Sequence, residues 1–435
     1  MMKHFGVRRF LTSALLLTLL ATSISSANAR LIDLKPNTFS QTKPPARTHR
    51  FRIRTITAGV NLESTSDLKT IQSAIEFLQH ARKKYEDAGY EIQTVRIATQ
   101  PFSQYLNGKS RAEALEGLKK IDEVLSANNV ILSIGPAITT DRHDPEFAPW
   151  AAQLIQQTKN ISLSVTVASE RGIHTQTVLT AAETIVAISK ASPGGEGNFR
   201  FAAAANVTPG PFFPVAYHRG PVGFSIGLET PRLLQQAFEQ ANGIKDIVDA
   251  QQKLLKLLDA ELGPVERLAE EISQNERREY FGIDTSPAPS KDASIGAAIE
   301  AFTHAPFGAS STLLACAAIT EVLKSLKIKI CGYSGLMLPV LEDPVLATRA
   351  AEGRYTVREL LLYSSVCGTG LDVVPLPGDT STADLAALIS DVAALSSKLR
   401  KPLAARLFLI PGKKAGDRAE FTNPFLTSSV VMKLE

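Results

Sequence analysis

The feature that most limits the fold of this chain is a repeated alternation between short apolar segments and longer amphipathic ones. Residues Phe51–Val60 alternate polar and apolar side chains with the period of a strand. Asp67–Ala88 follow, with apolar residues at helical spacing up to Gly89. The same pair recurs at Ile92–Ala98 and Arg111–Asn128. Because alternating strands and helices build sheets covered by helices, the pattern predicts an α/β fold.

Later segments continue this pattern to about ten or eleven strands in two runs. A long amphipathic helical region, Pro231–Arg277, lies between the runs, and its leucines have the spacing of a core-facing helix. A chain of 435 residues is long enough for two or three domains or for one large barrel. We predict a single large α/β barrel over residues 50–435, with about ten strands in two halves and the helices outside.

The N-terminus has the pattern of a secretory signal peptide. Basic residues precede the apolar run Phe10–Ala21, and Ala27–Ala29 supplies the small residues of a cleavage site. We predict that residues 1–29 are removed, that residues 30–49 form a polar, Pro-rich flexible lead-in, and that the protein is secreted or periplasmic. An uncleaved anchor and an organellar transit peptide are the alternatives. No other apolar run in the sequence approaches the length of a membrane helix.

Charge and cysteine content exclude two further classes. The formal net charge is +4 and the basic residues are scattered, so we expect no nucleic-acid partner. Three cysteines allow at most one bridge within the chain, so disulfides do not build this fold. Cys316 and Cys331 lie in apolar segments, where we expect small buried side chains, and the sequence does not decide whether they pair.

The stretch Val366–Thr380 concentrates residue types that carry chemistry. It holds the thiol of Cys367, the carboxylates of Asp372 and Asp379, three glycines and two prolines. Glycine permits backbone conformations that approach a ligand closely, and proline stiffens the chain. The functional interpretation is a site loop. The structural interpretation is a Gly-rich turn that feeds a strand around Val373–Leu376, with the acids capping the next helix.

A fourth candidate, Asp284, ends a strand-like segment and enters a Pro-rich loop. In α/β folds, ligands sit at the carboxyl ends of strands. We therefore predict that Cys367, Asp372, Asp379 and Asp284 converge in one pocket at the mouth of the barrel. A carboxylate metal site of the three aspartates is a weaker alternative, because no His or Cys spacing supports it. No sequence motif identifies a cofactor or a metal.

The loop Thr208–Pro221 contains four prolines and the pair Phe212-Phe213. It is either a rigid wall or lid that presents His218 as a proton carrier, or a structured turn whose phenylalanines fill the core. Glu342-Asp343 has a simpler interpretation as the cap of the following helix.

Four motifs in order carry a resemblance to a known family. They are F-R-I-R-T-I-T-A-G-V-N-L, Y-F-G-I-D-T-S-P-A-P with S-I-G-A-A-I-E, G-Y-S-G-L-M-L-P-V-L-E-D, and V-C-G-T-G-L-D-V-V-P-L-P-G-D-T. Over residues 50–435 the chain resembles the domain-of-unknown-function family 711. The resemblance implies a ten-stranded barrel of the pyruvate formate-lyase type, built from two five-stranded halves, with Cys367 on the loop that enters the barrel.

The resemblance implies no reaction, since fold similarity alone does not define chemistry. Glycyl-radical catalysis is excluded, because that chemistry needs a C-terminal glycine motif and the stretch Phe421–Glu435 contains no glycine.

The functional prediction is an exported enzyme that acts on a small polar metabolite. Cys367 would be the nucleophile or acid/base, and the three aspartates would be acids or metal-orienting groups. His218 would be the proton carrier. The alternative is a non-catalytic exported protein that binds a small ligand in the same pocket. The sequence is compatible with a homo-oligomer and names no substrate.

Overall fold

The computed structural model describes residues 49–434. The predicted signal peptide and nearly all of the predicted lead-in lie outside the described residues, so both stay predictions. The α-helices are α1 Leu68–Asp87, α2 Arg111–Asn128, α3 Phe147–Gln157, α4 Thr175–Ala191, α5 Pro231–Glu239, α6 Ile247–Glu276, α7 Ile295–Thr303, α8 Thr312–Ser325, α9 Pro344–Ala351, α10 Val357–Tyr363 and α11 Thr382–Leu399. Short 3-10 helices are η1 Phe102–Gln104, η2 Pro193–Arg200 and η3 Gly243–Lys245.

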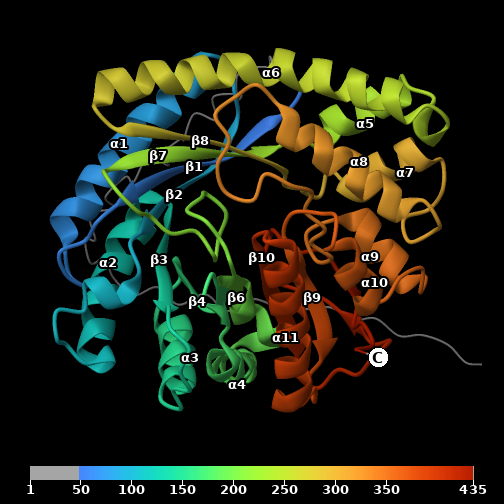
Figure 1. The fold of residues 1–435 in the computed structure, drawn as a ribbon. Coiled ribbons are helices and arrows are strands. Elements are labelled where there is room, and N and C mark those ends of the chain that lie inside the picture. Colours follow the sequence, from blue (N-terminus) through green and yellow to red (C-terminus); the bar gives the residue numbers. More distant parts are fainter. Residues whose placement is uncertain (1–48, 435) are drawn as a thin grey trace, which may run out of the picture. The chain divides into compact units, whose positions relative to one another are not determined.

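A large mixed sheet forms the centre of the described part, with helices around it (Figure 1). Its strands are β1 Arg52–Val60, β2 Ile92–Thr99, β3 Val130–Ile138, β4 Ile161–Ser169, β5 Gly172–Ile173, β6 Phe201–Ala205, β7 Gly223–Glu229, β8 Glu279–Pro287, β9 Gly370–Pro377 and β10 Leu403–Ile410. The order is β8-β7-β1-β2-β3-β4-β6-β10-β9, with β5 on β4. A separate pair joins β11 Arg418–Ala419 to β12 Ser429–Val430. The predicted α/β class and the large sheet are confirmed.

The sheet consists of two blocks of parallel strands. β1, β2, β3, β4 and β6 run parallel to one another. The second block consists of β7, β8, β9 and β10: the parallel pair β7–β8 is antiparallel to β1, and the parallel pair β9–β10 is antiparallel to β6. The amino ends of the first block therefore lie at the same edge of the sheet as the carboxyl ends of the second. The prediction that the halves divide at Pro231–Arg277 is wrong, because α5 and α6 connect β7 to β8 within one block; the blocks divide at the loop 206–222.

The hydrogen-bonded path of strands is open between β8 and β9. The segment 329–340 lies against both of these edge strands through single bridges, Ile283 with Ile330 and Pro339 with Asp372. Only an isolated bridge therefore forms where a strand was predicted over Ile328–Tyr333, because this segment passes from one edge strand to the other instead of pairing along either.

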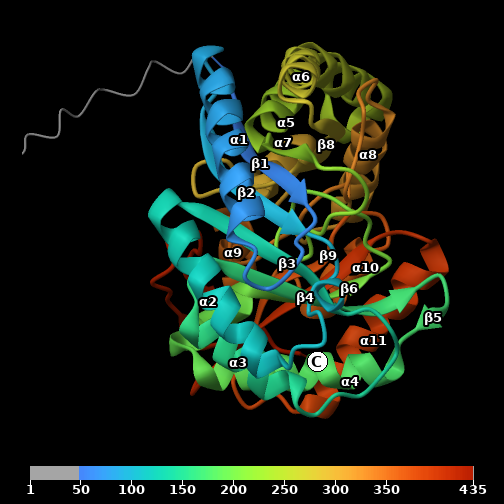
Figure 2. The ribbon, with the colours of Figure 1, turned by 90° about the vertical axis from the view of Figure 1, so that its left-hand side faces the viewer.

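Helices cover the outer face of the sheet. In Figure 2, α1 and α2 lie on the side of the first strands that faces the viewer. The amphipathic pattern explains this, since the apolar residues on one face of α1, such as Ile71, Leu78 and Tyr85, are buried. Local signals also set the helix ends: α2 begins with a capping box between Ser110 and Glu113, and Asp343 caps α9 as the sequence predicted.

The inner face of the sheet is crossed by the loop 206–222. Thr57 of β1 donates a hydrogen bond to the carbonyl of Pro211, and Ser133 of β3 donates one to the carbonyl of Ala216. On the other side Val215 packs with Ala404 of β10. These contacts fix the loop against both blocks, so that it separates the two ends of the sheet.

Candidate functional site

A cavity of about 880 Å³ lies on one side of this loop. Its lining comes from the amino-terminal parts of the first block, including Arg54, Arg96 and Ser162, and from the carboxyl-terminal side of the second, including Pro289 and Glu342. The topology explains this location, because the antiparallel blocks bring these strand ends to one edge. The cavity therefore lies at the carboxyl ends of the strands of the second block but at the amino ends of those of the first. The rule that ligands lie at the carboxyl ends of strands can hold for only one of two antiparallel blocks.

A buried chain of ion pairs forms one wall of the cavity. Arg54 Nη2 donates to Glu342 Oε2 at 2.7 Å, and Arg406 Nη2 donates to Glu342 Oε1 at 2.6 Å. Arg406 Nε also donates to Asp372 Oδ1 at 2.7 Å. Both oxygens of Glu342 are thus engaged, and the four groups together are neutral. Burial alone would lower the pKa of Arg406, but the adjacent carboxylates raise it above its ordinary value.

Two β-bulges place members of this chain. The pairing of β1 with β7 shifts between Ile53 and Thr55, at Arg54. The pairing of β10 with β9 shifts around Arg406, so that Asp372 and Val373 face one residue. Val373 has a φ of 42°, which is strained for a β-branched side chain. Bulges redirect side chains near sites, and here they bring Arg54 and Asp372 to the cluster.

Arg96 lines the same cavity but has no carboxylate partner in the described part of the chain. Its Nε donates to Thr94 Oγ1 at 3.1 Å, and its guanidinium lies 5.0 Å from the ring centre of Phe213. The side chain is only 8% exposed. Burial and the charge of Arg54 lower the pKa of Arg96 to about 9, which still leaves it cationic at neutral pH. A buried cation without a counter-ion is costly, so Arg96 is poised to receive an anion.

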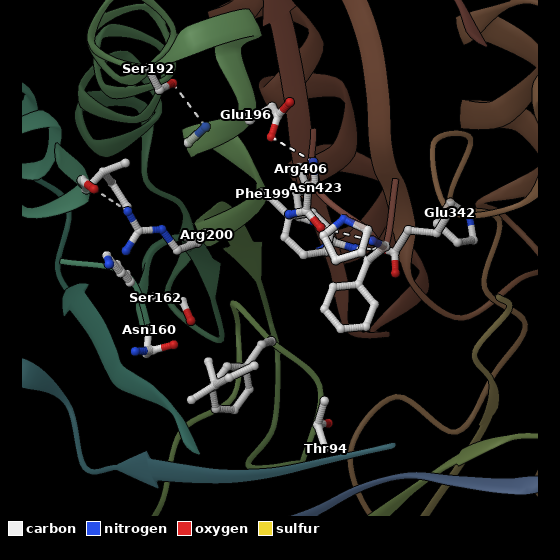
Figure 3. Close-up of a pocket in the computed structure, with 18 of the residues that line it drawn as sticks. Thr94, Asn160, Ser162, Ser192, Glu196, Phe199, Arg200, Glu342, Arg406 and Asn423 are labelled. Carbon is white, nitrogen blue, oxygen red and sulfur yellow. Dashed lines mark hydrogen bonds and ion pairs between the residues drawn. The ribbon is translucent and has the colours of Figure 1, made fainter. Parts of the chain in front are cut away.

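A second group of polar side chains faces the cavity from the start of β4 and β6. Figure 3 shows Arg200, Asn160 and Ser162 on one side of the view and Arg406 and Glu342 on the other. The basic residues that line the cavity outnumber the acidic ones: Arg54, Arg96, Lys159, Arg200 and Arg406 against Glu196 and Glu342. The cavity therefore favours anionic ligands.

Aromatic rings supply the apolar surface. Phe212 and Phe213, from the loop 206–222, line the cavity. Phe212 is also buried in a cluster with Ala288 and Met337, so the prediction of a rigid wall or lid that presents His218 stays a prediction. Phe199 lies 4.9 Å from the guanidinium of Arg406, and Phe425 lies 5.8 Å from that of Arg54. A ring against the face of a guanidinium leaves the N–H groups at its edge available for hydrogen bonds.

A strap from the C-terminal part of the chain, Thr422–Phe425, also lines the cavity. The carboxylate of Glu196 accepts hydrogen bonds from the backbone N–H of Thr422 at 2.6 Å and of Asn423 at 3.1 Å, and from the hydroxyl of Thr422. These contacts hold the strap to η2.

The four residues predicted to converge do not form one pocket. Cys367 precedes β9 and Asp379 follows it, so the eight residues of that strand, roughly 25 Å, separate them. Cys367 is buried, whereas Asp379 is exposed. Only Asp372 belongs to the charged cluster, and even it does not line the cavity. The predicted convergence is wrong: Gly370–Pro377 of this stretch form the strand β9, as the structural interpretation of a turn feeding a strand expected.

Cys367 and Asp284 are held by local contacts. Burial raises the pKa of the Cys367 thiol, although Lys401 opposes the shift. Asp284 is fully buried and accepts hydrogen bonds from the backbone N–H groups of Ser286, Tyr333 and Ser334 at 2.8 to 3.0 Å. It therefore anchors the segment 329–340 to β8. Their predicted catalytic roles stay untested predictions.

His218 lies at the opposite end of the sheet from the cavity. Its backbone N–H donates to the carbonyl of Thr99, and its ring packs on Gly59, where an added Cβ would come within 2.3 Å of Nδ1. Burial lowers the pKa of His218, so it is neutral at neutral pH. It does not line the cavity, and its role as a proton carrier stays a prediction.

Sequence reasoning missed Arg96 and Arg406, and it treated Glu342 only as a cap. A signal was present: Arg406 interrupts the apolar strand L-A-A-R-L-F-L-I, and Arg96 interrupts V-R-I-A. Charged side chains are rarely buried without a partner or a function, so a lone arginine within an apolar strand marks an internal site.

Other features bear on the remaining expectations. Cys316 is buried as predicted, Cys331 is only partly buried, and all three cysteines are free thiols. Within residues 49–434, no cluster of three His, Cys, Asp or Glu side chains could hold a metal ion. No helix in the same range is long and apolar enough to span a membrane.

Fold and site together define a class: a mixed α/β protein with a ten-stranded sheet and an internal, arginine-lined cavity. Residues 46–423 match the family described as Uncharacterised ACR (DUF711), and the chain belongs to this family. The family resemblance seen in the sequence motifs is thereby confirmed.

Relatives of the chain are UPF0210 proteins. One from Pyrobaculum islandicum is 31% identical over 381 residues, covering 82% of this chain and 81% of the relative. Another, from Pyrobaculum aerophilum, is 29% identical and covers 89% and 87%. A third, from Lactobacillus delbrueckii subsp. bulgaricus, is 26% identical and covers 86% and 89%.

Proposed function

We propose that this protein binds a small anionic molecule in the arginine-lined cavity. The observation that carries the proposal is Arg96, a buried guanidinium on the cavity wall that, within residues 49–434, donates a side-chain hydrogen bond only to the hydroxyl of Thr94. An oxyanion, either a carboxylate or a phosphate, can take two parallel hydrogen bonds from such a guanidinium. The volume of about 880 Å³ lies in the range of metabolite-sized ligand sites.

The ion-pair chain of Arg54, Glu342, Arg406 and Asp372 supports anion binding because it fixes the part of the cavity wall that contains Arg54 and Arg406. Because Glu342 and Asp372 together balance the charges of Arg54 and Arg406, those two guanidiniums do not need the ligand for charge balance. The cluster also acts on Arg96 directly: Arg54 and Arg406 help to lower the pKa of its guanidinium, and Glu342 opposes this shift. The phenylalanines can contact an apolar or planar part of the ligand.

Catalysis on the bound anion is the second candidate. The observation that favours it is the pair of carboxylates around Arg406. Burial raises the pKa of Asp372 above its ordinary value, Glu342 adds to that shift, and Arg406 opposes it. A carboxyl group with a raised pKa near a ligand can act as a general acid. Asp372 does not line the cavity, so binding is the simpler function.

Isothermal titration of the purified protein with benzoate, phenyl phosphate and inorganic phosphate tests the proposal. We expect binding of at least one probe, and a loss of about 10- to 100-fold in affinity in Arg96→Gln, as for a charge-assisted hydrogen bond. Arg171→Gln is the matched control, because Arg171 is exposed in the turn between β4 and β5. Equal affinities of the two variants, or no binding of any probe, would contradict the proposal.

We further propose that the sheet is completed into a barrel of the pyruvate formate-lyase type by the segment 329–340. The single bridges of Ile330 and Pro339 to the two edge strands support this. A crystal structure in which this segment leaves β8 and β9 apart would refute it.

Export also stays a proposal, supported by the basic start, the apolar run and the small residues up to Ala29. N-terminal sequencing of the natural protein should begin at Arg30. A sequence that begins at Met1 or Met2 would refute cleavage.

A further inference from the structure

The cavity contains a second guanidinium without a carboxylate partner. Arg200 ends η2, directly before β6, and lines the cavity. Its Nη1 donates to Thr158 Oγ1 at 3.1 Å and to the carbonyl of Ile161 at 3.0 Å, and its Nη2 donates to the carbonyl of Ile155. A guanidinium has five N–H donors, so two of them remain for another acceptor.

No carboxylate of the described chain neutralises Arg200 directly. The nearest contributing acid is Asp122, whose two oxygens already accept the backbone N–H groups of Lys159 and Asn160, each at 2.8 Å. Burial lowers the pKa of Arg200 to about 10, which leaves it charged at neutral pH. The ammonium of Lys159 lines the same part of the cavity and adds a second, exposed cation.

Arg96 and Arg200 lie on separate parts of the cavity wall. Arg96 is on β2, and Arg200 directly precedes β6; β3 and β4 lie between these strands. Three strand spacings amount to roughly 14 Å along the sheet. On the strands between the two arginines, Ile131 of β3 and Ser162 of β4 line the cavity, and the apolar Ile155 and Phe213 belong to the same wall.

We infer that the ligand is an elongated molecule with two anionic groups joined by an apolar body, one group bound by Arg96 and the other by Arg200 with Lys159. This inference rests on the proposed function, because it needs the first anion at Arg96. Both ends require only an oxyanion, so dicarboxylates and bisphosphates share the chemistry. Arg96 and Arg200 are two cations of one cavity without a bonded carboxylate, and a ligand with two negative charges would supply a partner to each of them.

A length series distinguishes one anchor from two. The probes are the dicarboxylates succinate, suberate, sebacate and dodecanedioate, each beside the monocarboxylate of the same carbon number. We expect sebacate or dodecanedioate, whose ends span roughly 10–14 Å, to bind about tenfold or more tightly than its monocarboxylate. The alkanediol bisphosphates of matching chain length form a second series of probes. The series that binds more tightly identifies whether the site prefers carboxylates or phosphates.

Variants assign the second anchor. Arg200→Gln should abolish the affinity advantage of the long dicarboxylate over its monocarboxylate, whereas Arg200→Lys should retain part of that advantage. Because Arg200 also tethers η2, its substitution can disturb the local fold. Lys159→Gln changes an exposed side chain instead, and it should reduce the affinity advantage of the long dicarboxylate by a smaller factor. Arg171→Gln is again the control.

The outcomes separate this inference from the proposed function. If monocarboxylates bind in an Arg96-dependent manner but chain length and the Arg200 and Lys159 substitutions make no difference, the second anchor is refuted and the proposed function stands. If no probe binds, both are contradicted. A length preference that persists in both Arg200→Gln and Lys159→Gln would place the second anion elsewhere and overturn the assignment.

Discussion

Both ends of the sheet contain polar and ionisable side chains, but these side chains differ in how many of their hydrogen-bonding groups have a partner within the protein. At the cavity end, Arg96 and Arg200 face open space with unused donors. At the other end, His218 packs between Gly59 and the carbonyl of Gly220, and the buried Cys367 lies where Lys401 donates to neighbouring carbonyls. The side chains of His218 and Lys401 at the second end are hydrogen-bonded within the protein. Unsatisfied charge, and not the presence of reactive residue types, therefore distinguishes the candidate site.

The comparison predicts first that Cys367 is protected from thiol reagents. Because the side chain is buried and its pKa is raised, labelling requires an opening of the structure and should be about a thousandfold or more slower than that of a free cysteine. Mass spectrometry after reaction with iodoacetamide, with and without denaturant, measures this. Labelling of the folded protein at the rate of a free cysteine would restore Cys367 as a candidate nucleophile and weaken the comparison.

The next largest effect should come from Glu342. Glu342→Gln leaves Arg54 and Arg406 buried with incomplete partners, so we expect the free energy of unfolding to fall by about 3–5 kcal/mol. Urea denaturation measures it. The control is Glu420→Gln, in an exposed pair with Arg418, which should change stability by less than about 1 kcal/mol. Similar changes in the free energy of unfolding in both variants would show that the buried ion pairs of Glu342 contribute no more to stability than an exposed pair.

A smaller effect is expected for the strap over the cavity. Glu196→Gln weakens the acceptor for the N–H groups of Thr422 and Asn423, which should accelerate hydrogen exchange of the strap by about fivefold, or ~1 kcal/mol. Exchange in α6, far along the chain from this contact, is the internal control. Unchanged exchange of the strap would mean that other contacts hold it in place.

The smallest effect concerns His218 and has a defined sign. Burial lowers its pKa below the ordinary value of 6.5, so the unfolded chain binds the proton more readily than the folded one. The free energy of unfolding should therefore fall as the pH drops below about 6.5, and His218→Gln should make this fall less steep. Stability curves at several pH values measure it, with exposed His80→Gln as the control. Parallel curves for His218→Gln and the unaltered protein would show that His218 is not held neutral.

Much of the fold could be predicted from the sequence, because periodicity reports local structure directly. The expected strand Ile92–Ala98 and helix Arg111–Asn128 match β2 and α2. The site could not be predicted in the same way. Gly- and Pro-rich stretches suggested loops, yet Gly370–Pro377 pairs with β10 as a strand. The antiparallel arrangement of the two blocks, set by long-range pairing, decides which strand ends meet.

The position of Asp372 shows most clearly which part of the site could not be predicted from the sequence. It was predicted as a site residue for its place in a Gly-rich loop, but it reaches the charged cluster through a β-bulge opposite Arg406. No local pattern in the sequence specifies a bulge, whereas the lone arginines within apolar strands were visible and carried the more useful signal.

The most direct test of the account is to locate an anion in the protein. Crystals grown with selenate, an oxyanion with strong anomalous scattering, would show where such a group binds. The account predicts an anomalous peak in the cavity within hydrogen-bond distance of the Arg96 guanidinium, and none beside Cys367 or His218. A cavity without selenate at saturating concentration, or a peak only at the opposite end of the sheet, would contradict it.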